Sequence, residues 1–188
     1  MAYQADQHYK NSDFTVEKFQ LIEYENCSFE QCKFSDLNLR GASFENCTFK
    51  RCDLSNLKVT GVPFRQVSFE DCKMLGIHFH ASNPFLLEFS FNSCQMDYCS
   101  FYSLKIKKTK FIASKLTEVD FTQADLSGAE FQNSDLSGAT FDRTELLSTD
   151  FRNASNYTID PELNRIKAAK FDLDGLPGLL AKYKIKIS

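Results

Sequence analysis

The sequence predicts an all-β solenoid, a chain wound into square coils of about twenty residues. Three observations predict it. Large apolar residues recur every five positions, a small or apolar residue lies two positions before each of them, and the other three positions are mostly polar or glycine. A helix repeats every 3.6 residues and a flat strand every two, so neither produces a step of five. A chain that turns a corner every five residues and closes after four corners forms such a coil.

The large apolar residues, which we call centres, form two runs of fourteen and include sixteen of the nineteen phenylalanines. The first run is Phe14, Phe19, Tyr24, Phe29, Phe34, Leu39, Phe44, Phe49, Leu54, Val59, Phe64, Phe69, Met74 and Phe79. The second is Leu86, Phe91, Met96, Phe101, Ile106, Phe111, Leu116, Phe121, Leu126, Phe131, Leu136, Phe141, Leu146 and Phe151. Phenylalanine alternates with Leu, Met or Ile in the second run. We therefore expect Phe91, Phe111, Phe131 and Phe151 to stack along one wall and Phe101, Phe121 and Phe141 along the opposite wall.

The step from Phe79 to Leu86 is seven residues, which predicts two inserted residues near 81–84. Asn83-Pro84 is a turn signal in this segment. Two interpretations stay open: a bulged corner in a continuous solenoid, or a loop that contacts a partner.

All seven cysteines occupy the small position two residues before a centre. Cys32, Cys52 and Cys72 are twenty residues apart, as are Cys27 and Cys47, so they should stack inside the coil as small hydrophobic side chains. The odd number of cysteines and the absence of a Cys-x-x-Cys motif argue against a disulfide framework and a zinc site.

The five-residue pattern stops after Ala154, and the rest of the chain predicts a cap. We divide the sequence into a lead-in (1–8), a solenoid (9–155) and a C-terminal cap (156–188). A turn or short helix is expected near Pro161. An amphipathic helix with Asp174 as N-cap is expected next, and then a short strand at the end of the chain. An exposed stripe and an edge strand favour a two-fold dimer, with a bare end cap as the alternative. The dimer residues would be Leu176, Leu179, Leu180, Tyr183, Ile185 and Ile187.

Length and composition predict one domain and exclude several classes of protein. The net charge of −3 gives no sign of a nucleic-acid binder, and no apolar run reaches the ~18 residues of a membrane-spanning helix. The first residues lack a signal-peptide pattern, so we expect a cytoplasmic protein. There is no phosphate-binding loop, nucleophile elbow or acid–base pair, and His78 and His80 have no third ligand beside them. We therefore expect no enzymatic activity, cofactor, metal or small-molecule substrate.

Two charged segments stand out. Residues 118–150 contain eight acids and one base, Arg143, and predict an acidic collar next to the dimer end. These acids are Glu118, Asp120, Asp125, Glu130, Asp135, Asp142, Glu145 and Asp150. The collar would dock on a basic groove, although acids just before a centre also serve to tie down turns. The second segment holds Lys105, Lys107, Lys108, Lys110 and Lys115, which form either a solvated face or a phosphate contact.

The repeat resembles that of the pentapeptide-repeat family, whose pattern is A(D/N)LXX. The most regular stretch is Ala124-Asp-Leu-Ser-Gly-Ala-Glu-Phe-Gln-Asn-Ser-Asp-Leu-Ser-Gly-Ala-Thr-Phe. The resemblance covers about residues 9–155 and implies a right-handed quadrilateral β-helix. Twenty-eight centres at four per coil give about seven coils.

Within that family the chain resembles the topoisomerase-protecting branch: the Qnr-type quinolone-resistance proteins, the mycobacterial fluoroquinolone-resistance protein and the microcin B immunity protein. The tail Ile159-Asp-Pro-Glu-Leu-Asn-Arg-Ile-Lys and the Leu-rich segment after it carry this resemblance. It implies a non-enzymatic, dimeric DNA mimic that binds a type II topoisomerase, DNA gyrase or topoisomerase IV. Such a protein protects the enzyme from quinolones or a toxin, or modulates it. The projecting loops of many Qnr proteins are missing here, which favours the loop-free members. The alternatives are a solenoid scaffold for another protein partner or, with less support, a nucleic-acid binder.

Overall fold

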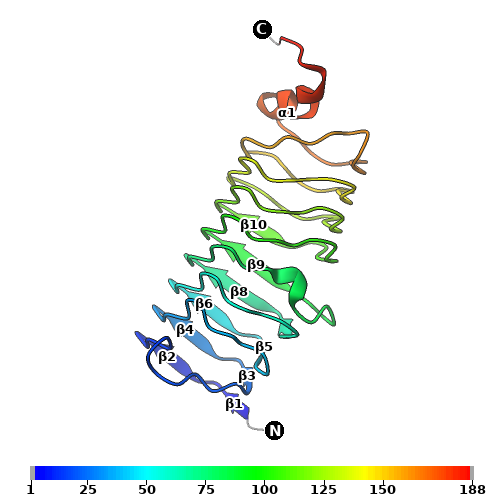
Figure 1. Cartoon of the computed structure of the whole chain (residues 1–188). Helices are drawn as coiled ribbons and strands as arrows, with labels where there is room; N and C mark the ends of the chain where they lie inside the picture. Colours follow the sequence, from blue (N-terminus) through cyan, green and yellow to red (C-terminus); the bar gives the residue numbers. More distant parts are fainter. Residues whose placement is uncertain (1–2, 187–188) are drawn as a thin grey trace.

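The computed structural model describes residues 3–186 and is a rod, a parallel β-solenoid of about six turns followed by one short helix (Figure 1). The larger sheet has six parallel strands in the order β10-β9-β8-β6-β4-β2. They are β2 (His8–Lys10), β4 (Ser28–Glu30), β6 (Thr48–Lys50), β8 (Val67–Glu70), β9 (Phe89–Asn92) and β10 (Lys110–Ile112). The smaller sheet contains β1 (Tyr3–Ala5), β3 (Glu23–Glu25), β5 (Ser43–Glu45) and β7 (Phe64–Arg65).

The strand register confirms the predicted coil of twenty residues. Phe29 pairs with Phe49 and Phe49 with Phe69, each twenty residues on. Isolated parallel bridges join equivalent residues of successive coils in four columns, which define four faces of the rod. We number the faces in chain order by their centres: face 1 contains Phe29 and Phe49, face 2 Phe34 and Leu54, face 3 Leu39 and Val59, and face 4 Phe44 and Phe64.

Most corners of the coil are made by a residue in the left-handed region of backbone space. Asn26, Asn46 and Asn56 have φ values of 51°, 51° and 57°, and each lies two residues after a centre. Gly128 and Gly138 take the same place with φ of 70° and 68°. Asparagine tolerates this conformation and glycine adopts it without steric cost, which explains their recurrence at this position.

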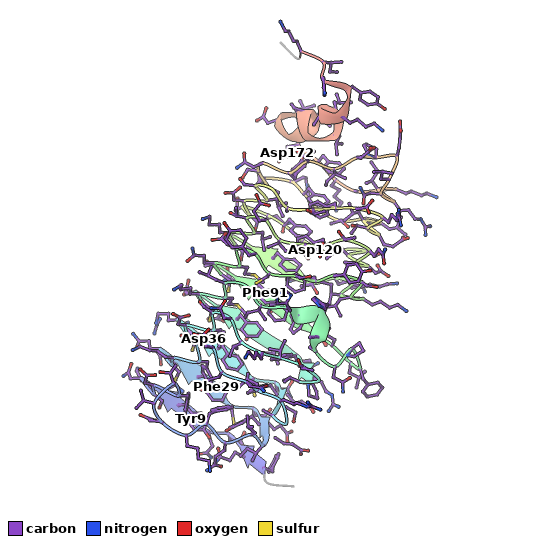
Figure 2. All side chains as sticks on the ribbon, in the orientation of Figure 1. Tyr9, Phe29, Asp36, Phe91, Asp120 and Asp172 are labelled. Atoms are coloured by element: carbon purple, nitrogen blue, oxygen red, sulfur yellow. The ribbon has the colours of Figure 1, made fainter. Side chains whose placement is uncertain are left out.

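In the C-terminal half of the rod the two predicted columns of stacked phenylalanines lie in the interior, among buried Leu, Met and Ile centres. Phe111 lies between Phe91 and Phe131, with ring centroids 5.2 and 5.0 Å away and nearly parallel planes. The facing column is similar, and Phe111 meets Phe121 edge-on at 5.6 Å. Figure 2 shows the rings of Phe29 and Phe91 inside the rod, whereas the side chains of Asp36 and Asp120 lie at its surface.

The cysteines are buried, as predicted, and all seven are free thiols. Their Sγ atoms donate hydrogen bonds to main-chain carbonyl oxygens: Cys52 Sγ lies 3.2 Å from the oxygen of Phe29 and 3.4 Å from that of Lys50. Hydroxyl groups continue the same column at Ser114 and Ser134, so this position takes a small side chain that can donate to the backbone.

The insertion lies later than the sequence indicated, and Leu86 is not a centre. Pro63 pairs with Asn83 and Val67 with Phe89, so the two extra residues fall within 84–88 rather than 81–84. Leu86 is 64% exposed. Phe89, which the pattern placed in the small position, is buried instead, with its ring 5.5 Å from that of Phe64. The extra residues let this larger ring fill the space that a centre would occupy. The 3₁₀ helix η1 (Phe79–Ala81) precedes the loop.

The solenoid pairing continues past residue 155, where the sequence pattern ends. Glu145 pairs with Arg165 and Asp150 with Lys170, and Phe171 stacks on Phe151 at 5.2 Å. Tertiary pairing therefore extends the coil over a segment that lacks the repeat.

The C-terminal cap is shorter than the sequence predicted. It consists of η2 (Leu173–Gly175), α1 (Leu176–Leu180) and η3 (Ala181–Tyr183). The N-cap of α1 is Gly175 and it makes no side-chain capping bond, so the assignment of Asp174 as N-cap was wrong. Ile185 belongs to no strand, and Ile187 lies outside the described residues.

Two glycines let this cap approach the end of the solenoid. A Cβ atom at Gly175 would collide with the hydroxyl of Tyr157, and one at Gly178 with the main-chain oxygen of Tyr157. The amide of Ile159 also donates to the Gly178 oxygen at 3.1 Å. Within residues 3–186, no helix has the length and apolar character needed to cross a membrane.

Candidate functional site: the acidic collar

The eight acids of the predicted collar surround the rod instead of gathering on one side. Asp120 and Asp142 lie on face 3, and Glu118 lies at the corner just before it. The other five acids occupy the remaining faces: Asp125 and Glu145 on face 4, Glu130 and Asp150 on face 1, and Asp135 on face 2. The collar therefore presents negative charge on every side of the C-terminal half of the rod.

Two pairs of these acids are direct neighbours in successive coils. Asp125 pairs with Glu145 on face 4, and Glu130 pairs with Asp150 on face 1. Neighbouring strands are about 4.8 Å apart, so like charges at this spacing repel and lower stability unless cations or a partner compensate them.

Four of the acids also stabilise the turns that follow them. Asp125 Oδ1 accepts hydrogen bonds from the amide and hydroxyl of Ser127 at 3.1 and 2.6 Å, and Asp135 accepts the same pair from Ser137. Asp120 and Asp150 accept the amides of Thr122 and Arg152, at 2.9 and 3.1 Å. The turn-forming role that the sequence also suggested therefore applies to half of the collar.

Five cations pair with four of the acids. Asp150 contacts Arg152 at 2.7 Å and Lys170 at 3.8 Å, and Arg165 contacts Glu145 at 3.0 Å. The remaining two pairs are Lys107 with Asp125 at 3.2 Å and Arg143 with Asp142 at 4.0 Å. The local balance of −7 in residues 118–150 thus overstates the charge that a partner would meet.

Such contacts lower the pKa of three collar carboxylates, those of Asp125, Asp135 and Asp150. A hydrogen bond from Arg152 lowers the pKa of Asp150, and hydrogen bonds from Asn156 and Ser137 lower the pKa of Asp135. Partial burial by itself would raise the pKa of Asp125, but the bonds from Ser127 and the nearby Lys107 outweigh it, and the net pKa is lowered.

The acids with neither a turn bond nor an ion pair among residues 3–186 are Glu118 and Glu130. Glu118 is exposed at its corner, and its carboxylate lies over Gly138, where a Cβ atom would come within 2.5 Å of Oε1. Glu130 is half-buried on face 1. These two carboxylates can be changed without removing a bond that holds the coil.

The lysine cluster lies one coil below the collar and in register with it. Lys105, Lys110 and Lys115 pair with Asp125, Glu130 and Asp135 respectively. Above the collar, Arg165 and Lys170 continue two of the same columns. The collar is therefore an acidic band between two basic ones. The twenty-residue step from each lysine to its acid is visible in the sequence.

The predicted dimer residues form a partly exposed surface on the cap. Leu176, Tyr183 and Ile185 are 39, 54 and 57% exposed. Leu179 packs against the core, and Leu180 is half-buried. Ile187 again falls outside the described residues. The cap is tied to the solenoid by Lys182, which contacts Asp160 and Glu162 at 2.8 and 2.6 Å.

His78 and His80 are exposed neighbours, with ring centroids 5.3 Å apart. His80 Nδ1 lies 3.1 Å from the hydroxyl of Ser100. Over residues 3–186 there is no group of three His, Cys, Asp or Glu side chains arranged to hold a metal ion.

Comparisons with known proteins support the fold. The family described as "Pentapeptide repeat region" matches residues 22–84 and 82–151. No curated protein sequence matches the chain. A solved structure of QnrB1, described as a plasmid-mediated fluoroquinolone resistance protein, is 16% identical over 100% of both chains, with a TM-score of 0.53.

A second solved structure is that of HetL, a pentapeptide repeat protein involved in heterocyst differentiation regulation in the cyanobacterium Nostoc sp. strain PCC 7120. It is 12% identical and aligns over 88% of this chain and 86% of its own, with a TM-score of 0.40. At these identities, likeness to QnrB1 indicates a shared fold, and the likeness to HetL carries no argument about function.

Proposed function

Because the chain belongs to the pentapeptide-repeat family, we propose that it is a non-enzymatic interaction protein that binds a type II topoisomerase by imitating DNA. Its partner would be DNA gyrase or topoisomerase IV, which it would protect from quinolones or a toxin, or modulate. The carrying observation is the collar, which places carboxylates on all four faces of a rod. A groove that normally holds a duplex would then meet negative charge from every side.

Other observations support the same proposal. The coils follow one another as a single rod up to the C-terminal cap, as a duplex segment does (Figure 1). QnrB1, which shares the fold, is described as a fluoroquinolone resistance protein. The lowered pKa values of Asp125, Asp135 and Asp150 keep their negative charge at neutral pH.

The test is gyrase supercoiling, with and without a quinolone, as purified protein is titrated in. Rescue of the poisoned enzyme or inhibition of the free enzyme is expected, and a parallel topoisomerase IV decatenation assay identifies the preferred enzyme. No effect on either enzyme at micromolar protein would refute the proposal.

A pair of matched variants tests the collar itself. Glu118→Lys/Glu130→Lys should weaken the effect on the enzyme and leave the circular dichroism spectrum unchanged, because neither acid holds a turn. Glu23→Lys/Asp71→Lys makes the same change in charge on exposed acids far from the collar and should act like the unmodified protein. Equal loss in both variants would mean that overall charge, not the collar, governs binding.

We also propose that the cap forms a two-fold dimer through Leu176, Leu179, Leu180, Tyr183 and Ile185. The exposed apolar area on α1 and η3 supports it, since such a surface favours burial against a second copy. Leu176→Asp should convert the dimer to a monomer in multi-angle light scattering, and a monomeric unmodified protein would refute it.

The loop at 84–88 favours a second candidate, a scaffold for another protein partner. Phe85 and Leu86 are each 64% exposed at its tip, and the guanidinium of Arg65 lies 5.9 Å from the Phe85 ring centre. The scaffold would be favoured over the topoisomerase proposal if the unmodified protein and Glu118→Lys/Glu130→Lys capture the same partner. Phe85→Ser/Leu86→Ser should then fail to capture that partner.

A further inference from the structure

Two exposed histidines lie side by side on face 3, in the middle of the rod. His78 and His80 flank the buried centre Phe79, and η1 carries the second of them. Their ring centres lie 5.3 Å apart, with the ring planes nearly perpendicular. Neutral imidazole is the commonest side-chain ligand of transition-metal ions, so an adjacent pair is a candidate metal site.

The separation of the two rings fits two ligands of one tetrahedral ion. A zinc ion lies about 2.0–2.1 Å from each coordinating nitrogen, and each ring centre lies roughly 1 Å beyond that nitrogen. A tetrahedral angle at the ion then places the two ring centres about 5 Å apart. The right angle of a square-planar or octahedral ion would bring them roughly 0.7 Å closer. The observed spacing therefore favours Zn²⁺ among the ions that imidazole prefers.

Hydrogen bonds to the neighbouring coil determine which nitrogen of His80 is available. Its Nδ1 lies 3.1 Å from the hydroxyl of Ser100, and that hydroxyl lies 3.2 Å from Oδ2 of Asp120. The Ser100 hydroxyl also accepts the amide of Tyr102 at 3.3 Å. A hydroxyl has one proton, and here it goes to the carboxylate, because an ionised carboxylate can only accept. Nδ1 of His80 is therefore a donor, and the lone pair that can bind a metal is on Nε2.

This chain of hydrogen bonds has the form that supports metal-binding histidines. Such a histidine donates its second ring N–H to an acceptor, which fixes the tautomer and makes the coordinating nitrogen more basic. The acceptor is well placed, since Ser100 is 8% exposed. The hydrogen bonds and ion pairs of histidine side chains within residues 3–186 belong to His8 and His80. Both ring nitrogens of His78 are therefore free to bind an ion.

We propose that His78 and His80 bind one Zn²⁺ ion, with Nε2 of His80 as one of the two protein ligands. Residues 3–186 contain no third His, Cys, Asp or Glu that completes a metal site with them. The missing third ligand, which argued against a closed metal site in the sequence, means an open one here, with water in the remaining positions. The site depends neither on a topoisomerase nor on the cap dimer. Of the collar acids Asp120 alone takes part, and it acts through Ser100.

Ligand number and charge make this a site of moderate affinity. Two ligands, half the set of a structural zinc site, leave roughly half its binding free energy, which gives a dissociation constant on the order of 1–200 µM. Lys58 lines the same hollow of face 3 as His78, and its ammonium group repels a dication. Arg40, Asp36 and Glu118 are each two coils away, about 10 Å, where salt screens most of their effect.

Calorimetric titration of the full chain with zinc chloride, on protein without a histidine tag, tests the proposal. His78→Gln and His80→Gln should each weaken zinc binding by a factor of about ten or more, and the double variant should not bind. His8→Gln changes the remaining histidine, which is also exposed, and should bind like the unmodified protein. Circular dichroism checks that each variant is folded. No binding up to about 1 mM zinc, or binding that persists in the double variant, would overturn the proposal.

A second set of variants tests the groups around the two ligands. Ser100 is a positioning residue, so Ser100→Ala should weaken zinc binding about 10–100-fold. Ser100→Thr keeps the hydroxyl and matches Thr140 in the same column, so it should bind normally. Lys58→Gln should tighten binding several-fold, whereas Lys18→Gln, three coils from the site on the same face, should not. Equal affinity in Ser100→Ala and the unmodified protein would refute the positioning of His80 by Ser100.

Discussion

Replacing Phe111 with alanine should destabilise the solenoid more than the same change at either end. The Phe111 side chain is fully buried. It stacks on Phe91 and Phe131 at 5.2 and 5.0 Å and meets Phe101 and Phe121 edge-on at 5.5 and 5.6 Å. Burial of a phenylalanine in a core that cannot collapse is worth about 3–5 kcal/mol, and we expect the upper part of that range.

A leucine at the same position separates stacking from burial. Phe111→Leu keeps most of the apolar volume but loses two stacked and two edge contacts. At about 0.5–1.5 kcal/mol for each stacked pair, the two stacks amount to roughly 1–3 kcal/mol. Phe171 is half-buried, and the one phenylalanine ring it stacks on is that of Phe151. Phe171→Ala should therefore lower the free energy of unfolding by about half as much as Phe111→Ala.

Urea unfolding, followed by circular dichroism and tyrosine fluorescence, measures these differences, since the chain contains no tryptophan. The control is Phe85→Ala, at an exposed ring, which should change the free energy of unfolding by less than about 0.5 kcal/mol. Equal losses for Phe111→Ala and Phe171→Ala would refute the reasoning, because they would mean that position along the column does not matter.

Three further predictions concern pH, the cap and the thiols. The pKa of Asp150 is lowered in the folded state, so its contribution to stability is present above the unfolded pKa of about 4 and is lost as pH falls through the folded pKa. Asp150→Asn should therefore reduce the loss of unfolding free energy that is measured as the pH falls into the acid range. Gly178→Ala should push the cap away from Tyr157 and speed proteolysis within 173–186. Gly61→Ala strains a corner with φ of 72° in the N-terminal half but meets no neighbouring atom, so it should leave the cap intact. Burial raises the pKa of Cys99 to about 12 and that of Cys47 to about 11. A thiol reagent should therefore react slowly with the native protein, and in denaturant it should react with all seven cysteines. Rapid labelling of the native protein would contradict the buried column.

The candidate site was predictable in its members but not in its shape. The sequence identified the eight acids as one acidic segment. It did not indicate that Arg152, Arg165 and Lys170 neutralise part of the collar, because these residues lie outside the acidic segment. Arg165 and Lys170 reach the collar from the next coil, so their contacts exist only once the coils have closed, whereas Arg152 reaches Asp150 from two residues away.

The sequence by itself determined the coil and its core. A large residue every five positions and a small one two before it can both be buried only if the chain turns at that interval, so the phenylalanine columns and the cysteine ladder follow from local spacing. The tertiary structure alone decided the exceptions. Phe89 displaced Leu86 because the two inserted residues follow Asn83, and pairing beyond residue 155 arose because an open coil end offers unpaired backbone groups to the segment that follows. It also decided which carboxylates stay free, since that depends on the side chain that the neighbouring coil brings within reach.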